Sequence, residues 1–127
     1  MRGAAITRKT AETDITLILD LDGTILKHNG YREGGDQLLE GAKEFLSAIP
    51  AKDMIIIVTA RASEYRQETE GFLRANGVRF DHIIFDAPHG ERILINDRKP
   101  GIDRMSVGLT VERNAPIDIS VVENPEM

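Results

Sequence analysis

Apolar residues along the chain follow two different patterns, which predict strands and helices in alternation. Residues Ile15–Leu19 form a continuous apolar and β-branched run that ends at Asp20. Such a run is typical of a strand in a parallel sheet, where both faces are covered. Between Leu38 and Ile49, apolar residues instead recur at helical spacing until Pro50 stops the pattern. This second segment is therefore predicted to be an amphipathic helix packed on a sheet.

The same alternation continues along the chain. Met54–Val58 predicts a second strand, and Ser63 is suited to cap a helix that runs to about Asn76. Three further short β-type runs follow at 82–85, 92–95 and 106–111. Five strands with helical connections predict an α/β fold with a doubly wound, Rossmann-like parallel sheet and little or no cap. The connection at 86–91 is, however, too short for a full helix.

The length predicts one domain over residues 1–127, with a core at about 15–114 and tails at 1–13 and 116–127. The C-terminal tail contains apolar residues that alternate like an edge strand, and whether it pairs within or between subunits is open. Segment 23–37 is rich in Gly and polar residues and directly follows the first acidic strand end. We expect it to form a flap over a site rather than a separate cap domain.

Composition and charge narrow the possible functions. The chain has no cysteine, which removes disulfides and thiolate chemistry and is compatible with the cytoplasmic location that we expect. A net charge of −5 without a basic block argues against nucleic acid as a partner. No apolar stretch is long enough to span a bilayer, so a membrane partner is not expected either.

The segment Asp20-Leu21-Asp22-Gly23-Thr24 carries the strongest chemical signal. It places two carboxylates at the carboxyl end of a predicted parallel strand, where ligands bind in open α/β folds. Such carboxylates repel each other unless a cation lies between them, and Mg²⁺ prefers oxygen ligands of this kind. Gly23 allows the backbone to turn sharply there.

This segment resembles the first motif of the haloacid dehalogenase superfamily, Asp-x-Asp-Gly-Thr after an apolar strand, at every fixed position. The resemblance implies a magnesium-dependent phosphatase in which Asp20 attacks phosphorus and becomes an aspartyl phosphate. It implies that Asp22 protonates the leaving oxygen and then activates the hydrolytic water. Thr24 is implied to hold the loop.

The end of the second strand is similar to the second motif of that superfamily. There the resemblance implies that the Thr59 hydroxyl binds the transferring phosphoryl group, together with the backbone at Ala60. Arg61 is expected to reach the same anion. His28 and His89, in loops expected to border the site, are further candidates for contact with the substrate.

Segment 93–100 is similar to the fourth motif of short sugar-phosphate and capsule-biosynthesis phosphatases in the superfamily. Asp97 is implied to complete the Mg²⁺ site with the Asp20 side chain and the Asp22 backbone carbonyl. Whether Asn96 or Asp103 joins that site is left open.

The chain departs from the superfamily at its third motif, normally a Lys between the second and fourth motifs. No Lys occurs from Thr59 through Arg98. Lys99 is the preferred substitute as a phosphate-binding cation, with Arg92 and Arg79 as alternatives, although Arg is not equivalent to Lys as a compact charge.

The resulting interpretation is a phosphatase for a small phosphorylated metabolite, with a sugar phosphate suggested by the resemblance. Because the predicted fold has no cap domain to cover its site, a homo-oligomer in which another subunit covers it is a further hypothesis. The missing Lys keeps open a non-catalytic module of the same fold that binds a phosphorylated ligand or a protein partner. A phosphotransferase has the same sequence signals, whereas a phospho-accepting receiver domain lacks Asp-x-Asp-Gly-Thr.

Overall fold

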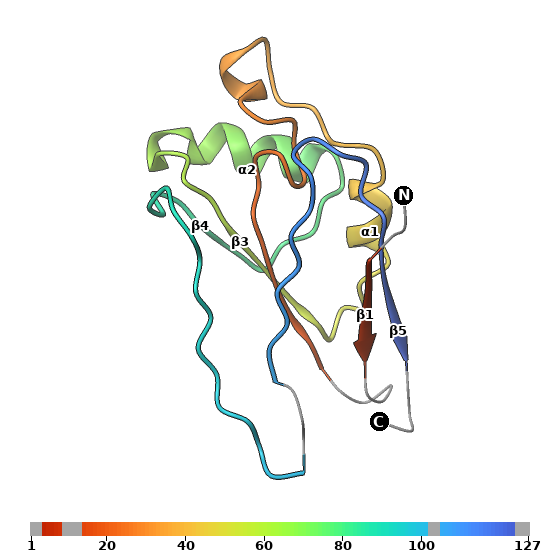
Figure 1. Ribbon diagram of the computed structural model, residues 1–127. Coiled ribbons are helices and arrows are strands. Elements are labelled where there is room, and N and C mark those ends of the chain that lie inside the picture. Colours follow the sequence, from red (N-terminus) through yellow and green to blue (C-terminus); the bar gives the residue numbers. More distant parts are fainter. Residues whose placement is uncertain (1–3, 9–13, 102–104, 124–127) are drawn as a thin grey trace.

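The chain forms an α/β structure with two separate parallel sheets (Figure 1). A computed structural model describes residues 4–8, 14–101 and 105–123. In the described residues the elements are, in chain order, β1 (Ala4–Arg8), β2 (Thr16–Leu19), η1 (Gly30–Arg32), α1 (Ala42–Ser47), β3 (Met54–Val58), η2 (Ser63–Tyr65), α2 (Arg66–Ala75), β4 (His82–Ile84) and β5 (Ile119–Glu123).

The central sheet has the strand order β2-β3-β4, and all three strands are parallel. Leu19 of β2 lies opposite Ile57 of β3, which in turn lies opposite Ile83 of β4. The strands are rich in Ile and Val, whose branched side chains favour extended backbone and pack well on a pleated surface. The predicted strands at 15–19, 54–58 and 82–85 are thereby confirmed.

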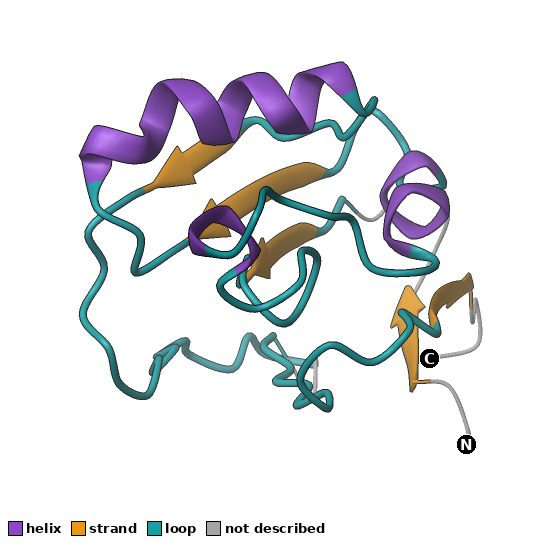
Figure 2. Ribbon diagram, turned by 90° about the horizontal axis from the view of Figure 1, so that it is seen from above, coloured by secondary structure: helices purple, strands orange, loops and turns teal. Residues whose placement is uncertain are grey.

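In the part of the chain that the structure describes, helix covers only one face of the central sheet (Figure 2). Figure 2 shows α2 along that face and the chain that follows β4 passing the opposite face. The core combines apolar side chains of the sheet with those of both α-helices and the loop after β2; its most buried members are Leu21, Ile25, Leu26, Leu46, Ile55, Ile57 and Leu73. On the opposite face, Ile18, Met54 and Ile84 are exposed. A parallel sheet normally has both faces covered, so this face is unusually open.

The strands predicted at 92–95 and 106–111 are not formed, and the five-stranded doubly wound sheet is therefore not confirmed. Ile93 and Ile95 are instead 82% and 88% exposed in an irregular segment. A parallel return to the same sheet needs a crossover of about a dozen residues or more. Because residues 86–91 form no helix, the chain leaves the sheet after β4 without crossing back.

The helix predicted over 38–49 is shorter than expected, since α1 spans only Ala42–Ser47. The Leu39 N–H donates to the Ile25 carbonyl at 2.8 Å, which holds the preceding residues in the loop layer instead. Gly41 caps the helix with φ 84°. The helix predicted from Ser63 to Asn76 is present as the 3₁₀ turn η2 followed by α2, but Ser63 lies within η2 and its side chain does not cap the helix.

The C-terminal tail pairs within the chain. Strand β5 lies parallel to β1, with Ile119 opposite Ala4 and Glu123 opposite Arg8. The Ile117 N–H donates to the Glu40 carbonyl at 2.7 Å, which attaches this tail to the start of α1. The sequence leaves open whether this tail pairs within or between subunits, and in this structure β5 pairs within the chain.

Replacing Gly41 with Ala is expected to lower the free energy of unfolding by about 1–3 kcal/mol. Gly41 has a positive φ, and a Cβ atom there would lie 2.5 Å from the Ile117 carbonyl oxygen. Gly71→Ala is the matched control, because Gly71 lies within α2 and a Cβ there meets nothing within 4 Å. That control should gain about 0.5–1 kcal/mol. Urea denaturation measures both; equal effects would contradict the proposed role of Gly41.

Candidate active site

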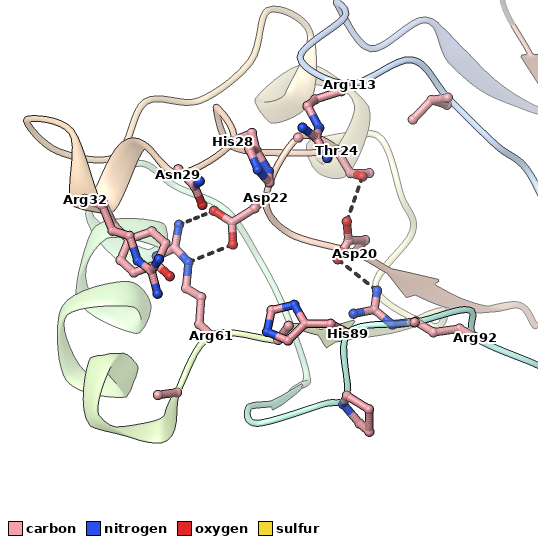
Figure 3. A pocket seen from close by; sticks show the side chains of 17 residues that line it. Asp20, Asp22, Thr24, His28, Asn29, Arg32, Arg61, His89, Arg92 and Arg113 are labelled. Carbon is pink, nitrogen blue, oxygen red and sulfur yellow. Dashed lines mark hydrogen bonds and ion pairs between the residues drawn. The ribbon is translucent and has the colours of Figure 1, made fainter.

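The acidic loop after β2 is a tight turn built on one carbonyl. The Leu21 oxygen accepts hydrogen bonds from the N–H groups of Thr24, Ile25 and Leu26 at 3.3, 2.9 and 3.0 Å. Gly23 takes φ 84°, and a Cβ there would lie 3.1 Å from Cγ of Arg113. A side chain at this position would therefore meet both backbone strain and a close neighbour. The turn directs Asp20 and Asp22 to the same end of the central sheet (Figure 3).

Asp20 lies at this end with its side chain 41% exposed. Its Oδ2 accepts a hydrogen bond from the Thr24 hydroxyl at 3.2 Å. Its Oδ1 accepts one from Arg92 Nη1 at 2.8 Å. Thr24 therefore orients the carboxylate, and Arg92 supplies a positive charge beside it.

Asp22 is held by the guanidinium of Arg61. Arg61 Nε donates to Asp22 Oδ2 at 3.0 Å, and Nη2 donates to Oδ1 at 2.8 Å. The other edge of the same guanidinium donates to Asp36, with Nη2 to Oδ1 at 2.7 Å and Nη1 to Oδ2 at 3.0 Å. Nη1 also donates to the Thr69 hydroxyl at 2.9 Å. Such paired hydrogen bonds fix position as well as charge.

Arg61 is almost completely buried, with a side-chain exposure of 1%. Burial alone lowers the pKa of Arg61, but the hydrogen bonds and charges of Asp22 and Asp36 outweigh it, so the pKa is raised above its usual value. The Tyr31 ring lies against Arg61, with Cζ 4.1 Å from the ring centroid. Because both Tyr31 and Asp36 lie in segment 23–37, Arg61 ties this expected flap to the end of β3.

Thr59 lies beneath the site rather than in its wall. It is 1% exposed, and its hydroxyl accepts a hydrogen bond from the Arg61 N–H at 3.1 Å. The following residues, Ala60 and Arg61, do line the pocket. Thr59 thus shapes the turn that presents Arg61, and its direct contact with a phosphoryl group stays a prediction.

The acids open into a pocket of about 720 Å³ in front of the strand ends. Figure 3 shows its side chains, which come from the loops after β2, β3 and β4 and from the segment before β5. Its charged and imidazole lining consists of Asp20, Asp22, His28, Arg32, Arg61, His89, Arg92 and Arg113. Four arginines against two carboxylates favour an anionic ligand. Both His28 and His89 border the site, as the sequence predicts.

Asp97 and Lys99 do not join the acids. Both lie in the exposed segment that follows Arg92, and neither lines the pocket. Asn96 lies in the same segment, and Asp103 is outside the described residues. The cation that pairs with Asp20 is Arg92 and not Lys99, which is the preferred substitute for the missing Lys of the third motif. Arg79 lies elsewhere, where it donates to Asp81 and to backbone carbonyls near the start of β3.

In this arrangement the groups implied to hold Mg²⁺ do not lie together, because Asp97 lies outside the pocket that Asp20 lines. Asp20 and Asp22 each accept hydrogen bonds from an arginine. Among the residues that the structure describes, no group of three or more His, Asp or Glu side chains is placed to hold a metal. In this arrangement the guanidinium groups of Arg61 and Arg92 balance the charge of the two carboxylates.

Sequence reasoning missed several residues at this site, among them Asp36, Arg113 and Asn114. Asp36 has no local motif and is recognised only as the second partner of Arg61. Asn114 has φ 61°; its N–H donates to the Gly23 carbonyl at 2.8 Å, and its Oδ1 accepts from the His28 N–H at 2.7 Å. These contacts bring the neighbouring Arg113 to the pocket. The one sequence signal in the segment Val-Glu-Arg-Asn-Ala is Asn114, a residue type that favours turns, and nothing in the segment indicates a ligand site.

Comparison with known proteins adds no assignment, since no family model, curated protein or solved structure matches the chain. In the described part of the chain, no helix combines the length and apolar character needed to cross a membrane.

Proposed function

We propose that the chain is a phosphomonoester hydrolase of the haloacid dehalogenase type, acting on a small phosphorylated metabolite through an aspartyl phosphate at Asp20. The observation that carries this proposal is the partly exposed Asp20 carboxylate at the end of β2, facing a pocket lined by arginines. Asp22 follows two residues later and provides a second carboxylate. A sugar phosphate is the proposed substrate class, on the strength of the sequence resemblance alone.

In the proposed first step, an Asp20 oxygen attacks phosphorus, the bond from phosphorus to the leaving oxygen breaks, and that oxygen takes a proton from Asp22. In the second step, water attacks the phosphorus, gives a proton to Asp22 and releases Asp20 and inorganic phosphate. Arg92 lies beside Asp20 and supplies positive charge where the phosphoryl group would sit.

Asp22 exchanges its proton while Arg61 holds its carboxylate, since the guanidinium donates one hydrogen bond to each of the two carboxylate oxygens. Asp36 holds the same guanidinium through two hydrogen bonds of its own. We infer that Asp36 keeps Arg61 in position while Asp22 changes its protonation state. Asp36 is in this sense a positioning residue.

The five-stranded sheet and the magnesium site are proposed together, because both require residues 92–95 to join the central sheet. Among the described residues, no strand pairs with the outer edge of β2 in the central sheet. If residues 92–95 add to that edge in the direction of β2, Asp97 reaches the same end of the sheet as Asp20. The exposed apolar side chains of Ile93 and Ile95 favour such burial. Magnesium dependence therefore requires this segment to change its position.

Phosphate release from a panel of sugar phosphates and other phosphorylated metabolites tests the hydrolase, with magnesium and with a chelator in parallel. We expect turnover of at least one compound. Turnover that needs magnesium and is lost in Asp97→Asn would support the added strand. Turnover that is independent of magnesium would overturn the metal site but keep the hydrolase.

A second candidate function is a non-catalytic module that binds a phosphorylated ligand. It is favoured by the arginine partners of Asp20 and Asp22, which pair with both carboxylates in this arrangement. Calorimetric binding of a panel compound without any phosphate release would select this module. Release of phosphate from the same compound would exclude it.

A further inference from the structure

The pocket contains more positive charge than its own acids balance. Arg61 is paired with Asp22 and Asp36, and Arg92 is paired with Asp20. In the described part of the chain, no acidic side chain forms an ion pair with Arg113 or Arg32, which also line the pocket. These two cations are available to a ligand after the phosphoryl site at Asp20 has been accounted for.

Arg113 is held at the pocket by its neighbour. Asn114 donates to the Gly23 carbonyl and accepts from the His28 N–H, at 2.8 and 2.7 Å, so the backbone next to Arg113 is fixed to the acidic loop. In Figure 3 the Arg113 side chain lies beside Thr24 and His28, on the opposite side of the acids from Arg61. Arg113 itself is exposed to solvent. Its backbone is anchored while its guanidinium remains accessible.

His28 provides an independent sign of a ligand at the same place. Its Nδ1 atom is buried and has no hydrogen-bond partner in the described structure. Buried polar atoms are nearly always hydrogen-bonded, and a turn of the half-buried His28 ring toward the pocket would let a ligand supply the partner that Nδ1 lacks. His28 lines the same pocket as Arg113.

We propose that Arg113 and His28 form a second anion subsite, so that the preferred ligand carries another anionic group besides its phosphoryl group. A carboxylate and a second phosphate share the required chemistry, since both accept charge-assisted hydrogen bonds from a guanidinium. This second subsite narrows the substrate class of the proposed function. It rests on that function, because it assumes that the phosphoryl group lies at Asp20. The substrate class becomes a phosphorylated sugar acid or a bisphosphate.

Three compounds separate the possibilities: glucose 6-phosphate with one anionic group, 6-phosphogluconate with an added carboxylate, and fructose 1,6-bisphosphate with an added phosphate. Calorimetry on the full chain is expected to show about tenfold tighter binding of at least one of the two-anion compounds than of glucose 6-phosphate. The ratio between those two compounds identifies the second anion. If the compounds turn over, the preference should appear in KM rather than in kcat.

Arg113→Gln is expected to bring the ratio of the affinity for the preferred two-anion compound to that for glucose 6-phosphate close to one. The affinity for glucose 6-phosphate itself should stay within about twofold. Arg98→Gln is the matched control, because Arg98 lies outside the pocket, and it should keep the preference. Equal binding of all three compounds by the unmodified chain would overturn the subsite. A preference that survives Arg113→Gln but is lost in Arg32→Gln would also overturn it. Two-anion preference without phosphate release would instead keep the subsite and remove the hydrolase.

Discussion

Asp20→Asn is expected to lower the rate of phosphate release by at least about a thousandfold while leaving the fold intact. An amide oxygen is a far weaker nucleophile than a carboxylate, and the substitution also removes the negative charge that Arg92 faces at 2.8 Å. Asn has nearly the same size and can still accept from Thr24. The measurement is kcat for hydrolysis of para-nitrophenyl phosphate, with urea denaturation to confirm the fold.

Asp14→Asn is the matched control for this experiment. Asp14 lies just before the opposite end of β2 and pairs with Lys52 at 3.9 Å, outside the pocket. The same chemical change there should leave kcat within about twofold, because exposed ion pairs contribute little. Equal losses in the two variants, or an Asp20→Asn protein that retains a substantial fraction of the rate, would contradict the role of Asp20.

Arg61→Met is expected to be the most destabilising substitution at the site, with a loss of about 3–5 kcal/mol in the free energy of unfolding. Arg61 lies between Asp22 and Asp36, and the side-chain exposures of Arg61 and Asp36 are only 1% and 8%. Removing the guanidinium leaves two carboxylates close together without a cation. Activity should fall as well, because Asp22 loses the partner that positions it.

A double-mutant cycle with Asp36→Asn separates the ion-pair network from a simple loss of packing. Adding Asp36→Asn to Arg61→Met should recover part of the stability, because one of the uncompensated charges disappears. Arg66→Met serves as the control, since Arg66 pairs with Glu70 on the surface of α2. We expect that control to cost no more than about 1 kcal/mol. A loss of similar size in both arginine variants would refute the proposed network.

The sequence predicts the elements that surround Asp20 because their signals are local. Continuous β-branched runs identify β2 and β3, and the Asp-x-Asp-Gly-Thr segment identifies the turn in which Gly23 takes φ 84°. The meeting of Asp22 and Arg61 at one end of the sheet then follows from the parallel direction of the strands. The positions of Asp20 and Asp22 at the end of β2, and of the turn after β3, are therefore predictable without the structure.

Other features depend on chain geometry that local patterns do not encode. The β-type run at 92–95 has strand propensity, but the short connection after β4 does not carry it back to the sheet. Asp97 and Lys99 consequently lie away from the acids, and Arg92 takes the place beside Asp20. Asp36 lacks any motif, because its role arises from a contact with a residue 25 positions later.

The most direct test of the central claim is mass spectrometry of the full chain quenched in acid during turnover of para-nitrophenyl phosphate. If Asp20 is the nucleophile, a fraction of the protein gains the mass of one phosphoryl group, and peptide mapping places that group on Asp20. Asp20→Asn should show no such product. Turnover without any phosphorylated protein, or a phosphoryl group on another residue, would contradict the account.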